Sequence, residues 1–210
     1  MPQEKIAILG ANGILGERLR HYLGQQKNLE IIALTRADAD VTDKDAVAAL
    51  LRQLKPGWVI NCTAFLNTDR CEAEPEASYQ VNYLAAVRLG EIIAGMKTPR
   101  LIQFSTDYVF DGKSGGYSEQ SPPNPLSVYG RHKQMADAAL LQTPAYILRI
   151  ASLVGAGEGR PDIIKAMLGR VAGGAKKLDV VKELEISTAT TKFIAEVITQ
   201  MISIDRKSVV

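Results

Sequence analysis

The chain has little of the material from which disulfide-rich and metal-binding proteins are built. It contains two cysteines, Cys62 and Cys71, and two histidines among 210 residues. Neither their number nor their spacing suggests a disulfide framework or a zinc site, so we predict no bound metal. Two buried free thiols in a reducing compartment are the simpler interpretation, and the cytoplasm is the expected location.

Long apolar runs and an excess of charge are missing as well. No apolar stretch reaches the ~20 residues of a membrane-spanning helix, and the first residues lack a signal-peptide pattern. The 25 basic and 23 acidic residues leave a net charge of +2 and are mixed along the chain. No strong field therefore favours nucleic acid or an anionic membrane, and we expect neither as a partner. The length is sufficient for one domain with a full core.

The chain does have a regular alternation of short apolar runs with longer amphipathic ones. Strands that are apolar throughout are buried on both faces, as in a parallel sheet covered by helices. The pattern therefore predicts a doubly wound α/β fold. Strands are predicted over 5–10, 31–35, 58–62, 101–105 and 145–150, and helices over 13–25, 44–54, 76–96 and 129–141. Weaker patterns predict a helix over 162–171, a short strand over 178–181 and a final helix over 191–202.

Three glycines lie between the first predicted strand and the first predicted helix. Gly10 permits a tight turn, Gly13 lets the backbone approach a pyrophosphate, and Gly16 lets the helix pack closely on the strand. The helix N-terminus then presents N–H groups and a positive dipole end to the phosphates. A dinucleotide cofactor is therefore predicted, held by Gly10, Asn12, Gly13, Ile14, Leu15 and Gly16.

The end of the second strand discriminates between the two nicotinamide cofactors. An acidic residue there binds a ribose 2′-hydroxyl, whereas a basic one suits a 2′-phosphate. The sequence places Thr35 and Arg36 at this point, with Asp38 a little later. This pair favours NADPH, with NADH kept as an alternative. The third strand closes on Cys62, Thr63 and Ala64, where the backbone would run beside the cofactor.

A second motif carries the expected chemistry. Tyr129 and Lys133 are four residues apart on a predicted helix and so share one face. A nearby ammonium favours the phenolate and lowers the pKa of a tyrosine. Tyr129 would give its proton to a carbonyl oxygen as hydride arrives at the carbon, and Lys133 would hydrogen-bond the nicotinamide ribose. Thr106, at the end of the fourth strand, would hold the substrate oxygen against Tyr129.

These motifs resemble a known family. The G-x-x-G-x-x-G spacing is typical of extended short-chain dehydrogenases, which have a Rossmann fold. The runs 105–112 (STDYVFDG), 124–130 (NPLSVYG) and 69–75 (DRCEAEP), with 81–82 and 148–149, are similar to the dTDP-4-dehydrorhamnose reductase family. The similarity covers residues 5 to about 155 well and the remainder poorly.

The resemblance implies an activity, site residues and a domain division. The activity is NADPH-dependent reduction of the 4-keto group of a dTDP-6-deoxyhexose, which completes dTDP-L-rhamnose. It implies that Thr106, Tyr129 and Lys133 are catalytic, that Asp107 and Arg149 lie at the sugar nucleotide, and that 40–41 (Asp40, Val41) contact the adenine. Residues 1–155 would form the NAD(P)-binding domain, and 156–210 a partial substrate-binding lobe with a closing helix. A homodimer is one option for the assembly.

Departures from the family pattern lie on the substrate side. The Arg-Thr-Ser-Trp run of the family appears as Arg149-Ile-Ala-Ser152, so its stacking tryptophan is absent, and Leu66 replaces a threonine. A later family segment has become 182–190 (KELEISTAT). These changes keep a second hypothesis open: a non-catalytic NADP-binding regulatory homologue, like the regulatory subunit of methionine adenosyltransferase. A third, an epimerase or dehydratase with tightly held NAD, is disfavoured by Arg36.

Overall fold

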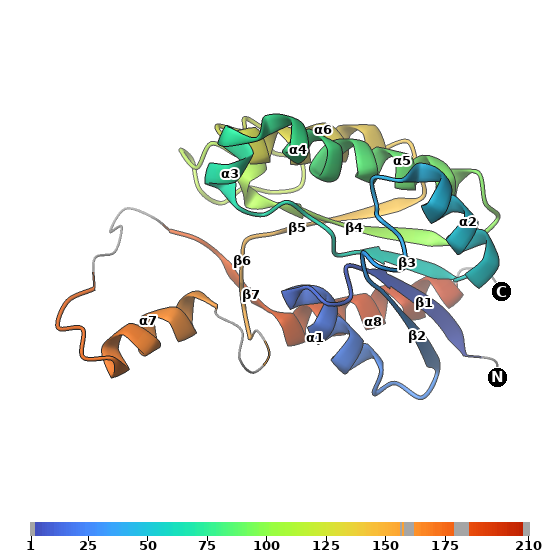
Figure 1. The fold of residues 1–210 in the computed structure, drawn as a ribbon, viewed down its shortest axis with the longest axis horizontal. Coiled ribbons are helices and arrows are strands. Elements are labelled where there is room, and N and C mark those ends of the chain that lie inside the picture. Colours follow the sequence, from blue (N-terminus) through green and yellow to red (C-terminus); the bar gives the residue numbers. More distant parts are fainter. Residues whose placement is uncertain (1–2, 156, 158–161, 179–184, 208–210) are drawn as a thin grey trace.

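The central feature of the fold is one parallel sheet of five strands, seen in a computed structural model that describes residues 3–155, 157, 162–178 and 185–207. The strand order is β2-β1-β3-β4-β5 (Figure 1). The strands are β1 (Glu4–Leu9), β2 (Leu29–Leu34), β3 (Trp58–Asn61), β4 (Arg100–Thr106) and β5 (Ala145–Ile150). The predicted doubly wound α/β fold is confirmed.

Helices cover both faces of the sheet. The helices α1 (Ile14–Leu23) and α8 (Thr191–Lys207) lie on one face, and α2 (Lys44–Leu54), α5 (Ala85–Ala94) and α6 (Val128–Leu140) lie on the other (Figure 1). Alternate side chains of β1 serve the two layers. Ile6 and Ile8 belong to the core beneath α1 and α8, whereas Ala7 and Leu9 belong to the core beneath the other three. Each large aliphatic side chain buried in this way contributes about 1.5–3 kcal/mol.

The final helix shares the core of the sheet. Ile194, Ile198 and Ile202 of α8 are buried in the same cluster as Leu19 and Leu23 of α1. The sequence analysis assigned this helix to the second unit of the chain as a closing helix. A division at residue 155 stays a prediction, but α8 packs with the first unit.

The segment after β3 differs from the predicted continuous helix over 76–96. It forms α3 (Thr68–Ala73), α4 (Pro75–Ser78), a π-helix η1 (Tyr79–Leu84) and then α5. The prediction of one α-helix was therefore wrong at its N-terminal half. Within η1, the buried amide side chain of Asn82 makes two hydrogen bonds to the backbone of Phe65. Its Oδ1 accepts from the Phe65 N–H at 2.9 Å, and its Nδ2 donates to the Phe65 carbonyl at 3.0 Å. A tertiary contact thus holds the turn that local propensity alone would leave α-helical.

The region beyond β5 forms a small second layer. The strands β6 (Ser152–Val154) and β7 (Thr188–Thr190) pair in parallel, and α7 (Ile163–Ala172) lies between them in the chain. The helix α7 stands away from the sheet (Figure 1), with Ile164, Leu168 and Val171 more than half exposed. The predicted helix over 162–171 is confirmed. Leu178 is not in a strand, and 179–181 lie outside the described residues.

The described residues hold neither a membrane-spanning helix nor a metal-binding cluster. In those ranges no helix combines the length and apolarity needed to cross a bilayer. The same part of the chain holds no cluster of three or more His, Cys, Asp or Glu side chains placed to bind a metal ion.

Candidate active site

A broad groove of about 2220 Å³ runs across the carboxyl ends of the strands. These ends include the switch point between β1 and β3, where ligands bind in doubly wound sheets. The volume is several times the ~300–1,000 Å³ of a site for one small ligand. Almost all the predicted cofactor residues line it: Gly10, Asn12, Gly13, Ile14, Leu15, Thr35, Arg36, Asp40, Val41, Cys62, Thr63 and Ala64.

The glycine turn is built as its spacing predicts. Gly10 has a φ of +74°, in the left-handed region that favours glycine. Gly16 does not line the groove but packs beneath it, where an added Cβ would lie 2.3 Å from the Gly10 carbonyl oxygen. Gly13 is the N-cap of α1, and no side chain caps the helix there. The uncapped N-terminus suits an anionic group because its first N–H groups lack intrahelical partners.

The loop after β2, at one edge of the groove, is held by side-chain hydrogen bonds. The Asp38 carboxylate accepts hydrogen bonds from the N–H and the hydroxyl of Thr35, at 2.7 and 2.8 Å. These two bonds lower the pKa of Asp38. Arg36 is 87% exposed at its side chain and pairs with Asp40 at 2.7 Å. Asp40 also accepts from the N–H and the hydroxyl of Thr42, which lower its pKa.

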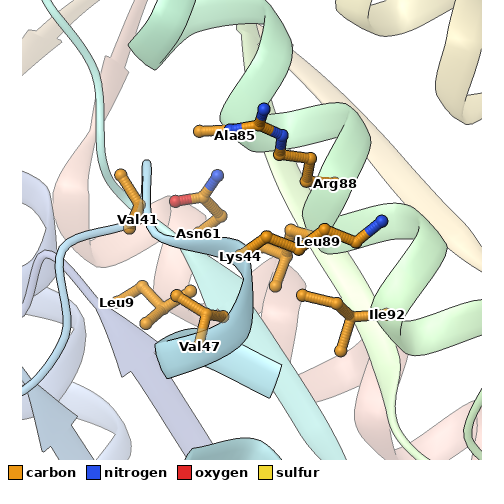
Figure 2. Close-up of a pocket in the computed structure, with 9 residues that line it drawn as sticks. All are labelled: Leu9, Val41, Lys44, Val47, Asn61, Ala85, Arg88, Leu89 and Ile92. Carbon is orange, nitrogen blue, oxygen red and sulfur yellow. The ribbon is translucent and has the colours of Figure 1, made fainter. Parts of the chain in front are cut away.

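A small cavity lies behind this edge, between β1, α2 and α5. Figure 2 shows Leu9, Val41, Val47 and Leu89 around it. Its volume of about 10 Å³ suffices for roughly one water molecule. The groove, not this cavity, is therefore the candidate site. Beside the cavity the Arg88 guanidinium donates to the Thr42 carbonyl at 3.1 Å and so ties the loop to α5.

The three predicted catalytic residues all lie on the groove. Thr106 ends β4, while Tyr129 and Lys133 are four residues apart on α6. The Thr106 hydroxyl accepts from the Tyr108 N–H at 3.2 Å and donates to the Asp107 carboxylate at 3.1 Å. The Tyr129 ring meets the exposed ring of Tyr108 edge-on, with the centroids 5.9 Å apart.

The pKa of Tyr129 is shifted in the opposite direction to the prediction. Its side chain is 7% exposed, and this burial raises the pKa of Tyr129 to about 12, whereas a hydrogen bond with Thr106 lowers it. The groups that shift this pKa most do not include Lys133, whose ammonium group donates to the Phe104 carbonyl. The expectation that Lys133 lowers this pKa was therefore wrong for the protein alone. The phenol stays protonated at neutral pH, which is the form a proton donor requires.

Lys133 is among the most buried ionisable groups of the described chain, with 3% exposure. Burial lowers its pKa to about 8, and the nearby Asp137 carboxylate raises it. One of its three hydrogens is used by Phe104. Two remain for hydroxyl groups of a ligand in the groove.

Asp107 and Arg149 both line the groove, in different surroundings. Asp107 accepts from Thr106 as described and begins the short 3-10 turn η2 (Asp107–Val109). Arg149 is directed instead into the protein, where its Nε donates to Asp137 at 3.0 Å. Its guanidinium also lies 5.4 Å from the ring centroid of Phe110. A role for either residue at the sugar nucleotide stays a prediction.

Sequence reasoning missed residues that position α6. Glu72 of α3 accepts a hydrogen bond from the Val128 N–H, at 2.7 Å, beside Tyr129. Ser127 caps the same helix by accepting from the Gly130 N–H at 3.1 Å. The negative charge of Glu72 favours a helix N-terminus. The helix α3, which carries Glu72, has six residues and is too short to show a periodic signal. Only Ser127, just before the predicted helix over 129–141, could have been noticed in the sequence.

The altered substrate side lines the same groove. Leu66 is exposed there, and Ser152 stands where the family pattern has tryptophan. Of the divergent segment, 182–184 lie outside the described residues, while 185–189 line the groove. The chain thus departs from the family pattern at residues that line the groove.

Comparisons with known proteins show which family the chain resembles. The dTDP-4-dehydrorhamnose reductase of Aggregatibacter actinomycetemcomitans is 34% identical over 180 residues, 85% of this chain and 60% of the relative. A solved structure described as a dTDP-4-dehydrorhamnose reductase from Clostridium acetobutylicum superposes with a TM-score of 0.87 at 31% identity, over 95% of this chain and 70% of that one. The Bacillus anthracis reductase, solved in complex with NADP, gives 0.89 at 25% identity, over 97% and 72%.

The matches cover most of this chain but only part of each relative. The chain spans 54–60% of the length of the first curated relatives that it matches. The family model described as the RmlD substrate binding domain matches residues 4–209. The resemblance inferred from the sequence is confirmed, and the chain belongs to the RmlD substrate binding domain family.

Proposed function

We propose that the chain is an NADPH-dependent reductase of a nucleotide-linked 4-keto-6-deoxy sugar, acting as in the last step of dTDP-L-rhamnose formation. The observation that carries the proposal is the placement of Thr106, Tyr129 and Lys133 on one groove with the glycine turn. The names of the relatives, dTDP-4-dehydrorhamnose reductases, support the same activity.

The residues around the glycine turn fit a dinucleotide. Gly10 has the backbone conformation of a tight turn, and the uncapped N-terminus of α1 suits a pyrophosphate. Thr35 and the exposed Arg36 would bind a ribose 2′-phosphate once Arg36 exchanges Asp40 for it. Asp40 and Val41 would meet the adenine, and 62–64 would run beside the cofactor. The presence of NADP in the Bacillus anthracis structure supports NADPH as the ligand, with NADH as the second choice.

The chain's own residues would manage the proton. The bound dinucleotide supplies hydride to the carbonyl carbon. Thr106 would hold the carbonyl oxygen against Tyr129, whose pKa its hydroxyl already lowers. Tyr129, protonated at neutral pH, would donate its proton to that oxygen. Lys133 would hold the nicotinamide ribose through its two remaining hydrogens.

The test is a direct assay with a matched pair of variants. NADPH and NADH are titrated by fluorescence, and loss of absorbance is followed with a panel of keto-sugar nucleotides that includes dTDP-4-keto-6-deoxyhexoses. We expect Tyr129→Phe to abolish turnover and keep NADPH binding. Tyr146→Phe is the control, because Tyr146 lies on β5 and stacks on Trp58, away from the groove. Full turnover by Tyr129→Phe would refute the assigned proton donor.

A second function is favoured by the substrate-side departures. A cofactor-binding regulatory homologue would retain the glycine turn and lose substrate contacts, as at Leu66 and Ser152. It would bind NADPH tightly and reduce nothing in the panel. That result would replace the reductase proposal by the regulatory one.

A further inference from the structure

A buried carboxylate joins three elements next to Lys133. Asp137 lies on α6, one turn after Lys133, and is 3% exposed. Its Oδ2 accepts hydrogen bonds from the Ser105 hydroxyl at 2.9 Å and from the Arg149 Nε at 3.0 Å. Ser105 and Arg149 are register partners on β4 and β5. The carboxylate therefore ties the catalytic helix to the ends of both strands.

The second oxygen of this carboxylate marks it as more than a packing residue. Oδ1 is buried and has no hydrogen-bond partner among the described residues. Burial raises the pKa of Asp137, while its bonds to Arg149 and Ser105 lower it. Leaving a charged oxygen unsatisfied costs free energy. We expect a buried carboxylate of this kind only where neighbouring cations need a counter-charge.

The charged groups nearest Asp137 are cations. Among the described residues, no other buried anion lies beside these cations. Lys133 precedes Asp137 on its own helix, and Arg149 faces it from β5. The other titratable group of α6 here is Tyr129, whose pKa is raised by burial and by the neighbouring Cys71, Asp107 and Tyr108. Asp137 is thus the counter-charge shared by a buried ammonium and a half-buried guanidinium.

We infer that Asp137 is a positioning residue that holds the Lys133 ammonium toward the nicotinamide ribose, with Ser105 and Arg149 fixing the carboxylate in turn. The inference rests on the proposed function only in taking the groove to bind NADPH. Among the described residues Lys133 bonds one carbonyl, that of Phe104. The charge next to it is therefore expected to help fix its position.

The consequence is a shift in the pH dependence of NADPH binding. Burial lowers the pKa of Lys133 to about 8 and Asp137 opposes that effect. Affinity should therefore fall as pH rises through about 8, where the ammonium loses its charge. Removing a neighbouring opposite charge moves a pKa by about one unit or more. In Asp137→Asn the fall should therefore begin about one pH unit lower.

The experiment measures the Kd of NADPH by fluorescence from pH 6 to 9. If the charged lysine is the binding form, Asp137→Asn should bind about three-fold more weakly than wild type at pH 7.5 and within about 1.2-fold at pH 6, from a one-unit shift. Asp137→Glu should restore most of the wild-type profile. Asp45→Asn, a charge removal on the exposed face of α2, should leave the profile unchanged.

Two results would overturn the inference. One is a loss of affinity in Asp137→Asn that is equal at every pH, which indicates a structural role alone. The other is an unchanged profile. If Asp137→Asn does not fold, Ser105→Ala serves as the second variant, because it retains the carboxylate and removes one hydrogen-bond donor to it. The pH at which NADPH affinity falls should then shift in the same direction by a smaller amount. Failure of the reductase proposal is seen separately, as absent turnover by wild type despite a normal binding profile.

Discussion

Gly130, which follows the proposed proton donor Tyr129, allows an unusually close contact. An added Cβ at Gly130 would lie 2.2 Å from the Tyr108 carbonyl oxygen, 3.0 Å from its carbon and 3.1 Å from the Pro125 Cβ. The first two are backbone atoms, so no flexible side chain can move aside. In Gly130→Ala the helix α6 or the segment after Thr106 must shift by about 1 Å to restore a normal contact.

The cost of this change follows from two opposing effects. Overpacking of this kind destabilises by about 1–3 kcal/mol, while replacing a helical glycine by alanine returns about 0.5–1 kcal/mol. The net loss of about 1–2 kcal/mol lowers Tm by about 2–8 °C for a chain of this size. Turnover should fall further, about 100-fold, because displacing reacting groups by ~1 Å has that effect.

Thermal unfolding, NADPH titration and keto-sugar turnover measure these effects together. NADPH affinity should fall less than turnover, since the glycine turn belongs to a different part of the groove and α6 would contact the cofactor through Lys133 alone. Gly169→Ala in α7 is the matched control, because no atom lies within 4 Å of its added Cβ. We expect it to leave Tm and turnover undiminished. A Gly130→Ala variant as stable and as active as wild type would refute the reasoning.

Three further changes test single contacts. Arg36→Ala should raise the Kd of NADPH about ten-fold, because one charge-assisted contact is lost, and leave the Kd of NADH unchanged. Equal effects on both Kd values would contradict a 2′-phosphate site. Glu72→Gln removes a charge from the N-terminus of α6 and should cost about 0.3–1 kcal/mol, read as a fall in Tm at low salt that shrinks at high salt. Bonds from Tyr117, Lys113 and Asn124 hold the pKa of Asp111 at about 2, so these contacts persist above pH 4 and are lost as pH falls through about 2. Asp111→Asn should expose the 111–125 loop to limited proteolysis at pH 7, and an unchanged cleavage rate would refute its role.

The sheet and its covering helices could be predicted because their signal is local. The bounds of α2 and β5 agree with the predicted ranges, since both are continuous apolar or amphipathic runs. The strand β7 was missed because Thr188–Thr190 is short and polar and becomes a strand only by pairing with β6. The π-helix was missed because Asn82 reaches a backbone segment 17 residues earlier.

The candidate site was predictable to the same extent. The glycine turn and the Tyr129–Lys133 pair are contiguous motifs, so their spacing carries their geometry. Asp137 has no such motif, because its partners Ser105 and Arg149 come from two strands. The pKa of Tyr129 could not be foreseen either, since burial outweighs the charge that its neighbour in sequence suggests.

The packing of α8 against α1 has a consequence for the synthesis of the chain. The apolar face formed by Ile6, Ile8 and Ile60 receives part of its cover from Ile194 and Ile198, far along the chain. At ~5–20 residues per second, roughly 10–40 s pass before α8 follows the first strand out of the ribosome. For that time the apolar face of the nascent sheet lacks part of its cover, and exposed apolar surface of this kind is prone to aggregate.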